Sequence, residues 1–287
     1  MNSWILASRP KTLPAAISPV IVGVSLAVHD SEFHLFTAFM TLLAAILIQI
    51  GANFANDVYD FLKGSDREDR LGPIRATQSG LISPENMKKG MWLVFTLAIC
   101  VGFYLASIGG WPIVCIGLIS IASGIAYTGG PYPLGYHGWG DVFVFIFFGI
   151  IAVPGTYYLQ TGFVSDYSIL FGISLGALST TILIVNNLRD ADTDVKSGKR
   201  TLAVRFGKSF VKMEYIVMMI LAFAIPIYIL QLWDEFSLYI ILFLLPISVR
   251  HIQSLYSETG ESLNLVLVNT AKFLFHFSIL LSIGLIL

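Results

Sequence analysis

The sequence predicts an all-α membrane protein with nine transmembrane helices, and three observations carry this prediction. Of the 287 residues, 56% are hydrophobic and only 12% are charged. The mean hydropathy is +0.78, and apolar runs of membrane-spanning length recur along the whole chain. A soluble domain carries about 25% charged residues, roughly twice this fraction, so the composition excludes a soluble globular protein. The formal net charge of −1 argues against a nucleic-acid-binding protein.

Nine segments reach the roughly 20 apolar residues that a transmembrane helix needs. They are residues 12–29, 35–59, 88–107, 111–128, 140–160, 166–188, 210–231, 236–254 and 264–286. None shows the alternation of a transmembrane β-strand, which excludes a barrel. The apolar run from Trp4 to Ala7 is too short for a cleavable signal, and Arg9 interrupts it. Without a transit peptide, we expect the plasma membrane of a prokaryote rather than a plastid membrane.

The basic residues are distributed asymmetrically across the nine predicted spans. All but one of the 17 Lys and Arg residues precede span one, lie between spans two and three or six and seven, or end span eight. The exception, Lys272, falls inside span nine. The opposite connections carry Asp and Glu but no Lys or Arg. The positive-inside rule therefore places the N-terminus and both basic connections in the cytoplasm.

A polar stripe ends the second predicted span. Asn53, Asn56, Asp57 and Asp60 follow one another at i, i+3, i+4 and i+7, which places them on one face of a helix. Uncompensated carboxylates near the hydrocarbon boundary are costly. We therefore expect this face to line a cavity and to find partners there.

A second polar stripe ends the sixth predicted span. Asn186, Asp190 and Asp194 are spaced by four residues, again on one helical face, and Asn187 adjoins them. A simpler interpretation is that such a stripe is a hydrated helix end at the cytoplasmic interface. Two copies in the same orientation, each followed by a basic connection, favour a shared site.

The two stripes also predict an internal repeat. Asn56 and Asp60 match Asn186 and Asp190 at an offset of 130 residues, and a glycine–lysine pair follows each copy. An even number of spans separates the copies, so both point the same way, as in a parallel repeat with a site between its halves. The expected organisation is one membrane domain, residues 1–287, with halves of roughly 1–128 and 129–287.

The residue types in the two stripes suit magnesium. Carboxylate and amide oxygens are hard ligands, and Mg²⁺ takes one or two carboxylates and completes its shell with phosphate and water. Two facing half-sites would hold a diphosphate between metal ions, while nearby Lys and Arg neutralise the remaining charge. In a dry pocket, this arrangement suits the removal of pyrophosphate from an allylic carbon.

Other interpretations of the acidic residues have less support. Residues 190–194 resemble the start of a calcium-binding EF loop, but Val195 and Thr201 stand where that loop needs glycine and glutamate. A proton- or ion-coupled transporter would place its carboxylates near mid-membrane, without paired basic loops. The sequence contains no HExxH, P-loop or GxGxxG motif, so zinc hydrolysis and nucleotide binding have no support.

Four stretches carry a resemblance to a known family. They are residues 7–14 (ASRPKTLP), 69–82 (DRLGPIRATQSGLI), 127–136 (YTGGPYPLGY) and 186–204 (NNLRDADTDVKSGKRTLAV). Together with the paired aspartate motifs, they make the sequence similar to the UbiA superfamily of intramembrane prenyltransferases. Within it, the sequence most resembles the branch of menaquinone biosynthesis that prenylates 1,4-dihydroxy-2-naphthoate.

The resemblance implies a fold and a reaction. The fold is a bundle of nine helices around a central cavity, with a cytoplasmic cap made by the two basic connections. The reaction transfers a polyprenyl group from polyprenyl diphosphate to 1,4-dihydroxy-2-naphthoate with two Mg²⁺ ions, releasing diphosphate and CO₂ and giving a demethylmenaquinol. Homogentisate or 4-hydroxybenzoate is the alternative acceptor. Residues 129–140 contain no Lys or Arg, unlike many benzoate-prenylating members, which favours the naphthoate.

The resemblance assigns catalytic roles to the two stripes, position by position. One Mg²⁺ would bind Asn56 and Asp60, and the other would bind Asp190 and Asp194. Asp57 would either ligate a metal or orient a ligand or a water molecule.

Substrate-binding roles follow from the same resemblance. The candidate diphosphate ligands are Lys63, Arg67, Arg70, Lys199 and Arg200, with Arg75 and Gln78 as lesser candidates. Arg9 or Lys11 would pair with the carboxylate of the acceptor, and Asn186 and Tyr127 complete the expected acceptor site.

Aromatic residues after span four have two interpretations. Tyr127, Tyr132 and Tyr136 would shield an allylic cation by cation–π contact. Aromatic residues are also common at membrane interfaces without such a role. We expect His137 and Asp141, in the same stretch, to be loop residues.

Overall fold

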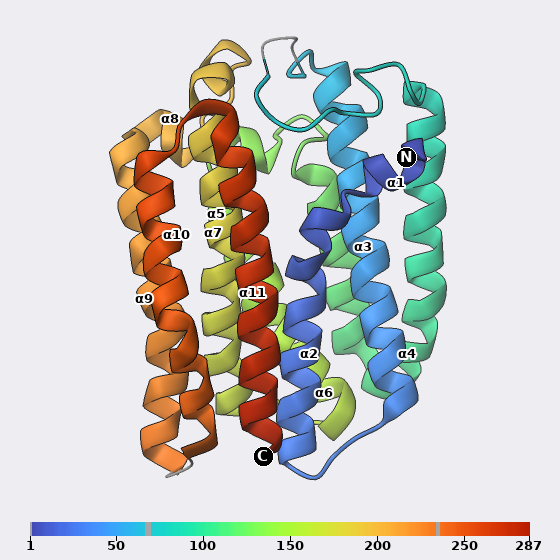
Figure 1. Ribbon diagram of the computed structural model, residues 1–287. Helices are drawn as coiled ribbons and strands as arrows, with labels where there is room; N and C mark the ends of the chain where they lie inside the picture. The colour runs from blue at the N-terminus through green and yellow to red at the C-terminus, as the bar shows by residue number, and fades with distance from the viewer. Residues whose placement is uncertain (1, 67–69, 234–235) are drawn as a thin grey trace.

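The computed structural model describes residues 2–66, 70–233 and 236–287, and these ranges contain helices but no strand (Figure 1). The α-helices are α1 (Ser3–Ser8), α2 (Leu13–His29), α3 (Leu35–Leu62), α4 (Pro84–Ala126), α5 (Gly140–Phe145), α6 (Ala152–Thr161), α7 (Asp166–Lys196), α8 (Leu202–Phe206), α9 (Lys208–Trp233), α10 (Leu245–Ser257) and α11 (Leu263–Ile286). The 3₁₀ helices are η1 (Pro10–Thr12), η2 (Leu134–His137), η4 (Phe236–Leu244) and η5 (Gly260–Ser262), and η3 (Ile146–Ile151) is a π-helical turn. The predicted all-α class is confirmed.

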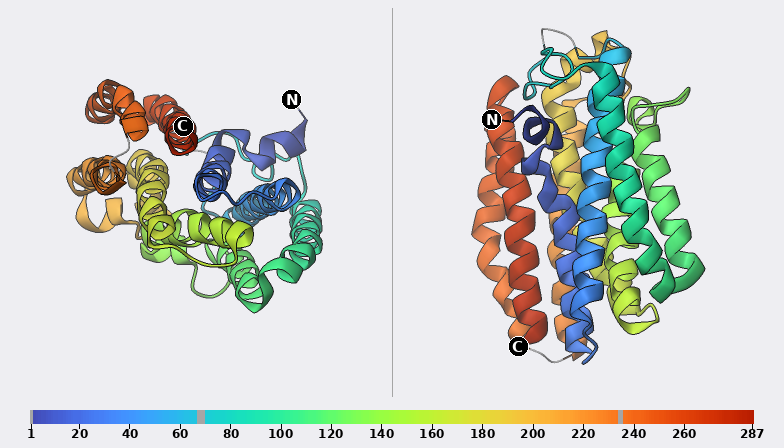
Figure 2. Two further views of the ribbon diagram at one scale, coloured as in Figure 1. Left: turned by 90° about the horizontal axis from the view of Figure 1, so that it is seen from below. Right: turned by 90° about the vertical axis from the view of Figure 1, so that its right-hand side faces the viewer.

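Eight helical segments in the described ranges are long and apolar enough to cross a membrane. The predicted span 88–107 and all but the last two residues of the predicted span 111–128 fall in α4, which has 43 residues. An unbroken helix of that length would be about 65 Å long, roughly twice the hydrocarbon core of a bilayer. The backbone leaves the helical region at Gly110, where φ is 64° and ψ is −153°, so α4 consists of two segments (Figure 2). The count of nine spans stays a prediction.

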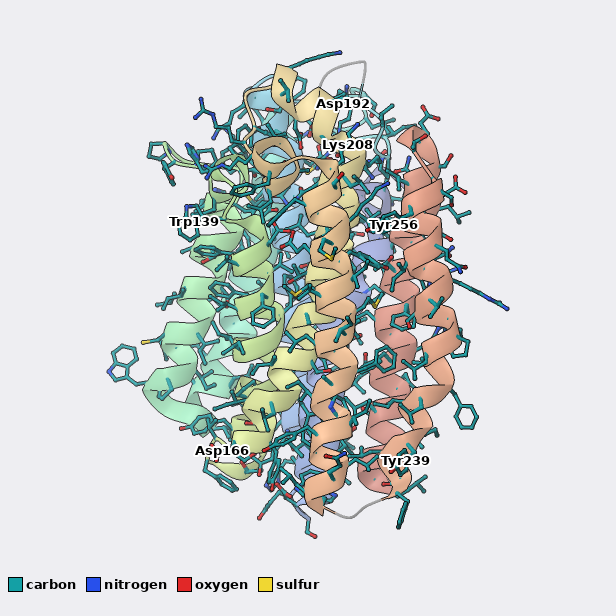
Figure 3. All side chains as sticks on the ribbon, turned by 90° about the vertical axis from the view of Figure 1, so that its left-hand side faces the viewer. Trp139, Asp166, Asp192, Lys208, Tyr239 and Tyr256 are labelled. Carbon is teal, nitrogen blue, oxygen red and sulfur yellow. The ribbon has the colours of Figure 1, made fainter. Side chains whose placement is uncertain are left out.

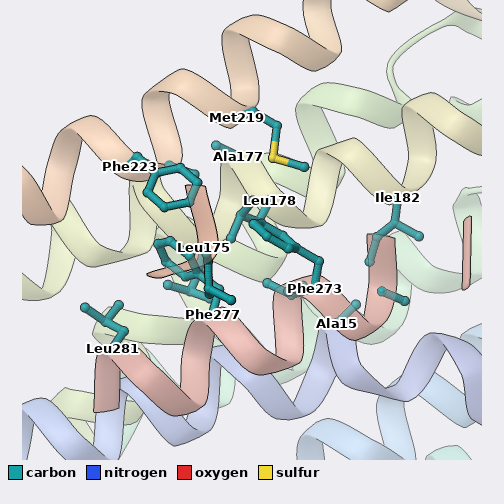
Figure 4. Close-up of a cluster of buried hydrophobic side chains, with 14 of the residues drawn as sticks. Ala15, Leu175, Ala177, Leu178, Ile182, Met219, Phe223, Phe273, Phe277 and Leu281 are labelled. Carbon is teal, nitrogen blue, oxygen red and sulfur yellow. The ribbon is translucent and has the colours of Figure 1, made fainter. Parts of the chain in front are cut away.

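Helix α7 is the central element of the larger hydrophobic core. It packs against α9, α11, α5 and η3. In this core, Leu175 and Leu178 of α7 are grouped with Met219 and Phe223 of α9 and with Phe273 of α11 (Figure 4). Burial of such side chains stabilises the fold by about 1.5–3 kcal/mol each. The helix that carries the second polar stripe is therefore held from several sides.

Helices α3 and α7 end in the same way. The amide five residues after Asp60 donates to the Asp60 carbonyl at 2.9 Å, and the equivalent amide donates to the Asp194 carbonyl at 3.0 Å. Gly64 and Gly198 follow these helices with φ of 69° and 75°. This is the Schellman ending, in which a glycine takes the left-handed conformation and the last helical carbonyls are satisfied.

The matching helix ends change the register of the predicted repeat. Gly64 and Gly198 are 134 residues apart, not 130. The pairs at this offset are Asn53 with Asn187, Asn56 with Asp190, and Asp60 with Asp194. Asp57 has Ala191 as its counterpart, so it has no acidic equivalent in the other helix. The division into two halves stays a prediction, and the helix ends favour an offset of 134 for it.

The two basic connections lie at the same end of the bundle. The chain between α3 and α4 and the chain around α8 both lie at the upper end in Figure 1. At that end Lys208 Nζ pairs with Asp192 Oδ2 at 2.7 Å, whereas Asp166 and Tyr239 lie at the opposite end (Figure 3). The predicted cap therefore has its two segments on one side of the bundle, and the membrane side that they face stays a prediction.

Candidate active site

A cavity of about 690 Å³ lies inside the bundle. Helix α3 lines it from Thr41 to Asp60, a distance of about 28 Å at 1.5 Å per residue. The far end is lined by an apolar cluster that includes Leu105, Ile113 and Leu159. Residues of both polar stripes line the other end. The cavity therefore has the form of a long apolar chamber with a polar end.

Asp60 lies at the polar end, and its carboxylate contacts groups from three other segments. Arg75 Nη2 donates to Oδ2 at 3.0 Å, and the Tyr136 hydroxyl donates to Oδ1 at 2.8 Å. Lys199 Nζ lies 3.3 Å from the same Oδ1. Only 2% of Asp60 is exposed, so the negative charge is compensated where water is scarce.

Asp57 has a different environment from Asp60. Its Oδ2 accepts the amide of Ala76 at 3.1 Å, and its Oδ1 accepts the amide of Thr77 at 2.9 Å. Asp57 is 1% exposed and does not line the cavity formed by the described residues. Its carboxylate therefore holds the chain between α3 and α4 against α3.

The two amides of the first stripe also have defined partners. Asn53 Nδ2 donates to the Ser8 carbonyl at 2.9 Å and to the Thr12 hydroxyl at 3.2 Å. Asn56 Oδ1 accepts the Thr128 hydroxyl at 3.0 Å. Both amides line the cavity, and Asn53 ties the start of α2 to α3.

The second half-site is organised by Arg189. Its guanidinium donates two bonds to Asp190, from Nε at 2.8 Å and from Nη2 at 2.6 Å. It also donates to Oδ1 of Asn186 and to Oδ1 of Asn264, both at 2.8 Å. Asn264, in α11, donates in turn to the Leu71 carbonyl at 2.8 Å. A buried network therefore connects α7, α11 and the first basic connection.

The two half-sites face the same space. Asp194 lines the cavity with Asp60, Asp190 and Asn56. Tyr127 lines the same cavity. Carboxylates of both stripes therefore face one space, which this tyrosine shares with them.

The structure places the candidate diphosphate ligands unequally. Arg70 and Lys199 line the cavity at its polar end. Lys63 is largely exposed, and its Nζ donates to the Gly130 carbonyl at 3.2 Å. Partial burial of the ammonium group lowers its pKa. Arg200 has an exposed side chain and lies outside the described cavity lining. Arg67 lies outside the described residues.

The candidate acceptor-binding residues also differ in their position relative to the cavity. Arg9 lines the cavity, and its Nη2 is buried without a hydrogen-bond partner. Arg9 has a left-handed backbone with φ of 49°, which is costly for a residue other than glycine and is common at functional sites. Asn186 and Tyr127 line the cavity as well, whereas Lys11 is exposed and does not.

Asp66 was not singled out from the sequence, whereas Arg75 was a lesser candidate for the diphosphate. Arg75 bonds Asp60, and its Nε lies 3.4 Å from Asp66 Oδ1. Arg70 Nε lies 3.4 Å from the same oxygen. Burial and the nearby charge of Asp60 raise the pKa of Asp66 to about 7. Arg75 lies in the stretch that carries the family resemblance, but its spacing gave no indication that it folds back onto α3.

Two residues after α4 lie in environments that differ from those expected. Tyr132 is 55% exposed, stacks on His137 at 3.7 Å between ring centroids, and does not line the described cavity. Asp141 is buried in the first turn of α5, so the expectation of a loop residue is wrong. Its position at a helix N-terminus explains this, since a carboxylate is favourable there.

The oxygen donors of the two stripes fit magnesium, although they do not form a finished metal cage. Among the described residues, no three His, Cys, Asp or Glu side chains converge on one point. Asp60 and Asp190 are instead paired with cations. Mg²⁺ needs only one or two carboxylates when a phosphate supplies the other oxygens. Asn56 with Asp60, and Asp190 with Asp194, supply such a donor set.

The fold and this site define a polytopic membrane protein whose cavity is suited to an amphipathic anion, with a long apolar body and a strongly charged head. Comparison with known proteins makes this class specific. The UbiA prenyltransferase family matches residues 16–279. The chain belongs to this family.

Relatives and solved structures agree with that membership. The 1,4-dihydroxy-2-naphthoate octaprenyltransferase of Haemophilus influenzae is 34% identical over 100% of this chain and 96% of its own. The Escherichia coli protein of the same name is 39% identical over 72% of this chain and 69% of its own. A UbiA homolog from Archaeoglobus fulgidus bound to DMAPP and Mg²⁺ has the same fold, with a TM-score of 0.70 at 14% identity over 98% of this chain and 99% of that one.

Proposed function

We propose that this enzyme transfers a polyprenyl group from polyprenyl diphosphate to 1,4-dihydroxy-2-naphthoate, with release of diphosphate and CO₂. One observation carries the proposal: carboxylates of both stripes line the polar end of an apolar cavity about 28 Å long. A diphosphate head and an isoprenoid tail match these two environments. The names of the bacterial relatives support the naphthoate as the acceptor.

The donor head would bind between the two half-sites. Mg²⁺, when bound, would offset the charge of the diphosphate and make it a better leaving group. Asn56 and Asp60 would hold one ion, and Asp190 and Asp194 the other. The cations at the polar end would contact the remaining diphosphate oxygens, with Arg70 and Lys199 as the candidates that line the cavity.

The acceptor would bind beside Arg9. The unpartnered Nη2 of this buried guanidinium suits a carboxylate, which arginine recognises through two parallel bonds. Tyr127 and Asn186 line the same cavity. Arg9 would therefore fix the carboxylate-bearing carbon of the naphthoate near the allylic carbon.

The reaction balances without a general base. The allylic C–O bond breaks and its electron pair leaves with the diphosphate. The carboxylate-bearing ring carbon bonds to the allylic carbon, and the C–C bond to the carboxylate then breaks. The electron pair of that bond restores the aromatic ring as CO₂ departs, so no proton is removed from the ring carbon.

A direct assay tests this proposal. Purified enzyme in lipid vesicles receives polyprenyl diphosphate, Mg²⁺ and naphthoate labelled in its carboxyl carbon. We expect labelled CO₂ and diphosphate in equal amounts, and no product when EDTA replaces Mg²⁺. A product that retains the label, or turnover with homogentisate or 4-hydroxybenzoate but not with the naphthoate, would contradict the proposed acceptor.

The orientation is also a proposal. We place the N-terminus and both basic connections in the cytoplasm of a prokaryote, which with nine spans puts the C-terminus outside. A periplasmic reporter enzyme fused after Leu287 would be active in this topology. An inactive reporter in a well-expressed fusion would indicate an even number of spans or the opposite orientation.

A further inference from the structure

We propose that Tyr136 is a positioning residue shared by the two basic connections, with its hydroxyl orienting Asp60 and its ring holding Lys63 and Lys199 near the polar end of the cavity. This inference rests on the proposed function, because it assigns these lysines to the diphosphate head. Tyr136 itself lies in η2, within a connection that contains no Lys or Arg between residues 129 and 140.

The hydroxyl of Tyr136 is part of a directed chain of hydrogen bonds. It donates to Asp60 Oδ1 at 2.8 Å and lies within hydrogen-bond distance of the Ser65 hydroxyl. Since its one proton goes to Asp60, the Ser65 hydroxyl is the donor to Tyr136. Arg75 holds the other oxygen of Asp60. The two carboxylate oxygens are therefore fixed by different segments, which limits rotation of the carboxylate.

The ring of Tyr136 contacts two ammonium groups. Lys63 Nζ lies 5.1 Å from the ring centroid, and Lys199 Nζ lies 4.8 Å from it. A cation within about 6 Å of an aromatic face is attracted by the ring quadrupole. The two lysines come from different connections and repel each other, so a shared aromatic surface keeps them together.

The backbone of Tyr136 is held independently of its side chain. The Arg200 amide donates to the Tyr136 carbonyl at 2.7 Å, and the Tyr136 amide donates to the Pro133 carbonyl at 3.0 Å. The turn that presents the ring is thus bonded to the connection that carries Lys199. Three segments meet at one side chain: residues 60–65, 133–137 and 199–200.

This arrangement assigns Tyr136 a role other than shielding an allylic cation. Its ring is already covered by lysine ammonium groups, and its hydroxyl is committed to Asp60. Residues 129–140 contain no Lys or Arg. Tyr136 nevertheless contacts one lysine from each of the two basic connections. The expected contribution is to the affinity for the diphosphate and for Mg²⁺, not to contacts with the prenyl tail.

Two substitutions at one position separate the hydroxyl from the ring. Tyr136→Phe removes the bond to Asp60 and keeps the aromatic surface, whereas Tyr136→Leu removes both. Tyr132→Phe and Tyr132→Leu are matched controls, because Tyr132 belongs to the same connection and lies outside the described cavity lining. Binding of inorganic pyrophosphate is measured by calorimetry over a range of Mg²⁺ concentrations, and KM and kcat are measured in parallel.

The expected results differ between the two variants. Tyr136→Phe should raise the Mg²⁺ concentration needed for half-maximal binding about 3- to 10-fold, while pyrophosphate affinity at saturating Mg²⁺ changes less than about twofold. Tyr136→Leu should in addition weaken pyrophosphate binding, and raise KM for the prenyl diphosphate, about 3- to 30-fold. The Tyr132 variants should match the wild type within about twofold.

A double-mutant cycle links the ring to a lysine. Lys199→Gln should weaken pyrophosphate binding more in the wild type than in the Tyr136→Leu background, because the ring no longer places the ammonium group there. Additive effects, or Tyr132→Leu matching Tyr136→Leu, would overturn the proposal. Thermal unfolding without ligand shows whether Tyr136→Leu has lost its fold. If it has, Tyr136→Phe decides the question, because an unchanged Mg²⁺ dependence of pyrophosphate binding in that variant also overturns the proposal.

The same measurements distinguish this inference from the proposed function. Pyrophosphate binding does not involve the acceptor, so normal binding without naphthoate turnover would refute the acceptor and leave the role of Tyr136 intact. Wild-type protein that does not bind pyrophosphate with Mg²⁺ would refute both.

Discussion

The replacement of Asp57 by asparagine tests whether the acidic residues of the first stripe have separate roles. In the structure, both oxygens of Asp57 accept backbone amides, from Ala76 and Thr77, and the side chain is almost fully buried. Asparagine keeps one oxygen for one of these amides and turns its own NH₂ group toward the other. We expect Asp57→Asn to loosen the connection between α3 and α4 and to leave the metal donors in place.

The size of the effect follows from the two bonds. A hydrogen bond to a charged group contributes about 1.5–3 kcal/mol, whereas a neutral bond contributes about 1 kcal/mol. The variant loses one charged bond and weakens the other, so the connection should open with about 2–4 kcal/mol less free energy. That difference corresponds to roughly 30- to 900-fold faster amide exchange at Ala76 and Thr77 if exchange follows the opening equilibrium.

Hydrogen exchange measured by mass spectrometry on a peptide covering residues 74–80 provides the assay. Asp192→Asn is the matched control, because the Asp192 side chain is 78% exposed and pairs with Lys208 on the surface. We expect this control to leave exchange in the peptide unchanged. Asp60→Asn should abolish protection by Mg²⁺ and pyrophosphate, whereas Asp57→Asn should keep it. Exchange within threefold of the wild type, combined with lost Mg²⁺ protection, would show that Asp57 is a metal ligand.

Three further predictions concern other parts of the molecule. Asn264→Ala removes one acceptor from Arg189, so KM for the prenyl diphosphate should rise several-fold; an unchanged KM would show that Arg189 needs no support from α11. Because the folded protein holds the pKa of Asp66 at about 7, above its unfolded value of about 3.9, it binds more protons than the unfolded chain between these values. The contribution of Asp66 to the stability of the metal-free protein should therefore fall as pH rises from 4 to 7, and thermal unfolding in EDTA should lack this contribution in Asp66→Asn. Gly110→Ala should destabilise the protein by about 1–3 kcal/mol, because its φ of 64° with ψ of −153° is essentially restricted to glycine; Gly117→Ala, with open space around it, should have little effect in the same unfolding assay.

The helices and the polar stripes could be predicted from the sequence because they depend on local periodicity. An apolar run of bilayer length has few alternatives to a helix, and a spacing of three and four residues places side chains on one face. The break in α4 at Gly110 falls between the predicted spans 88–107 and 111–128. These features need no knowledge of how distant segments pack.

The helix ends favour a different repeat register from the predicted one, because the prediction gave side-chain identity more weight than the positions where the helices end. Asn56 and Asp60 match Asn186 and Asp190 in residue type, but the structure aligns the glycines that end each helix. A glycine that ends a helix marks a fixed backbone position, whereas a polar residue of the same type can recur one helical turn away on the same face. Giving the glycines priority would have revealed the offset of 134 from the sequence.

The contacts of Tyr136 and Arg75 could not be predicted, because they depend on how irregular segments fold over the helix ends. Arg75 lies 15 residues from Asp60 in the sequence, and Tyr136 lies 76 residues from it. No periodicity governs such contacts. Only the family resemblance singled out these stretches from the sequence, and it does not indicate which residues they contact.

The bond from Asn264 to the Leu71 carbonyl spans 193 residues of sequence. Helix α11 therefore supports the end of the bundle that carries the polar stripes, because its Asn264 bonds both Arg189 and the first basic connection. During synthesis, the segments carrying the acidic residues enter the membrane well before this helix exists. The hydrogen-bond network of this charged end would therefore be completed only after α11 has been inserted.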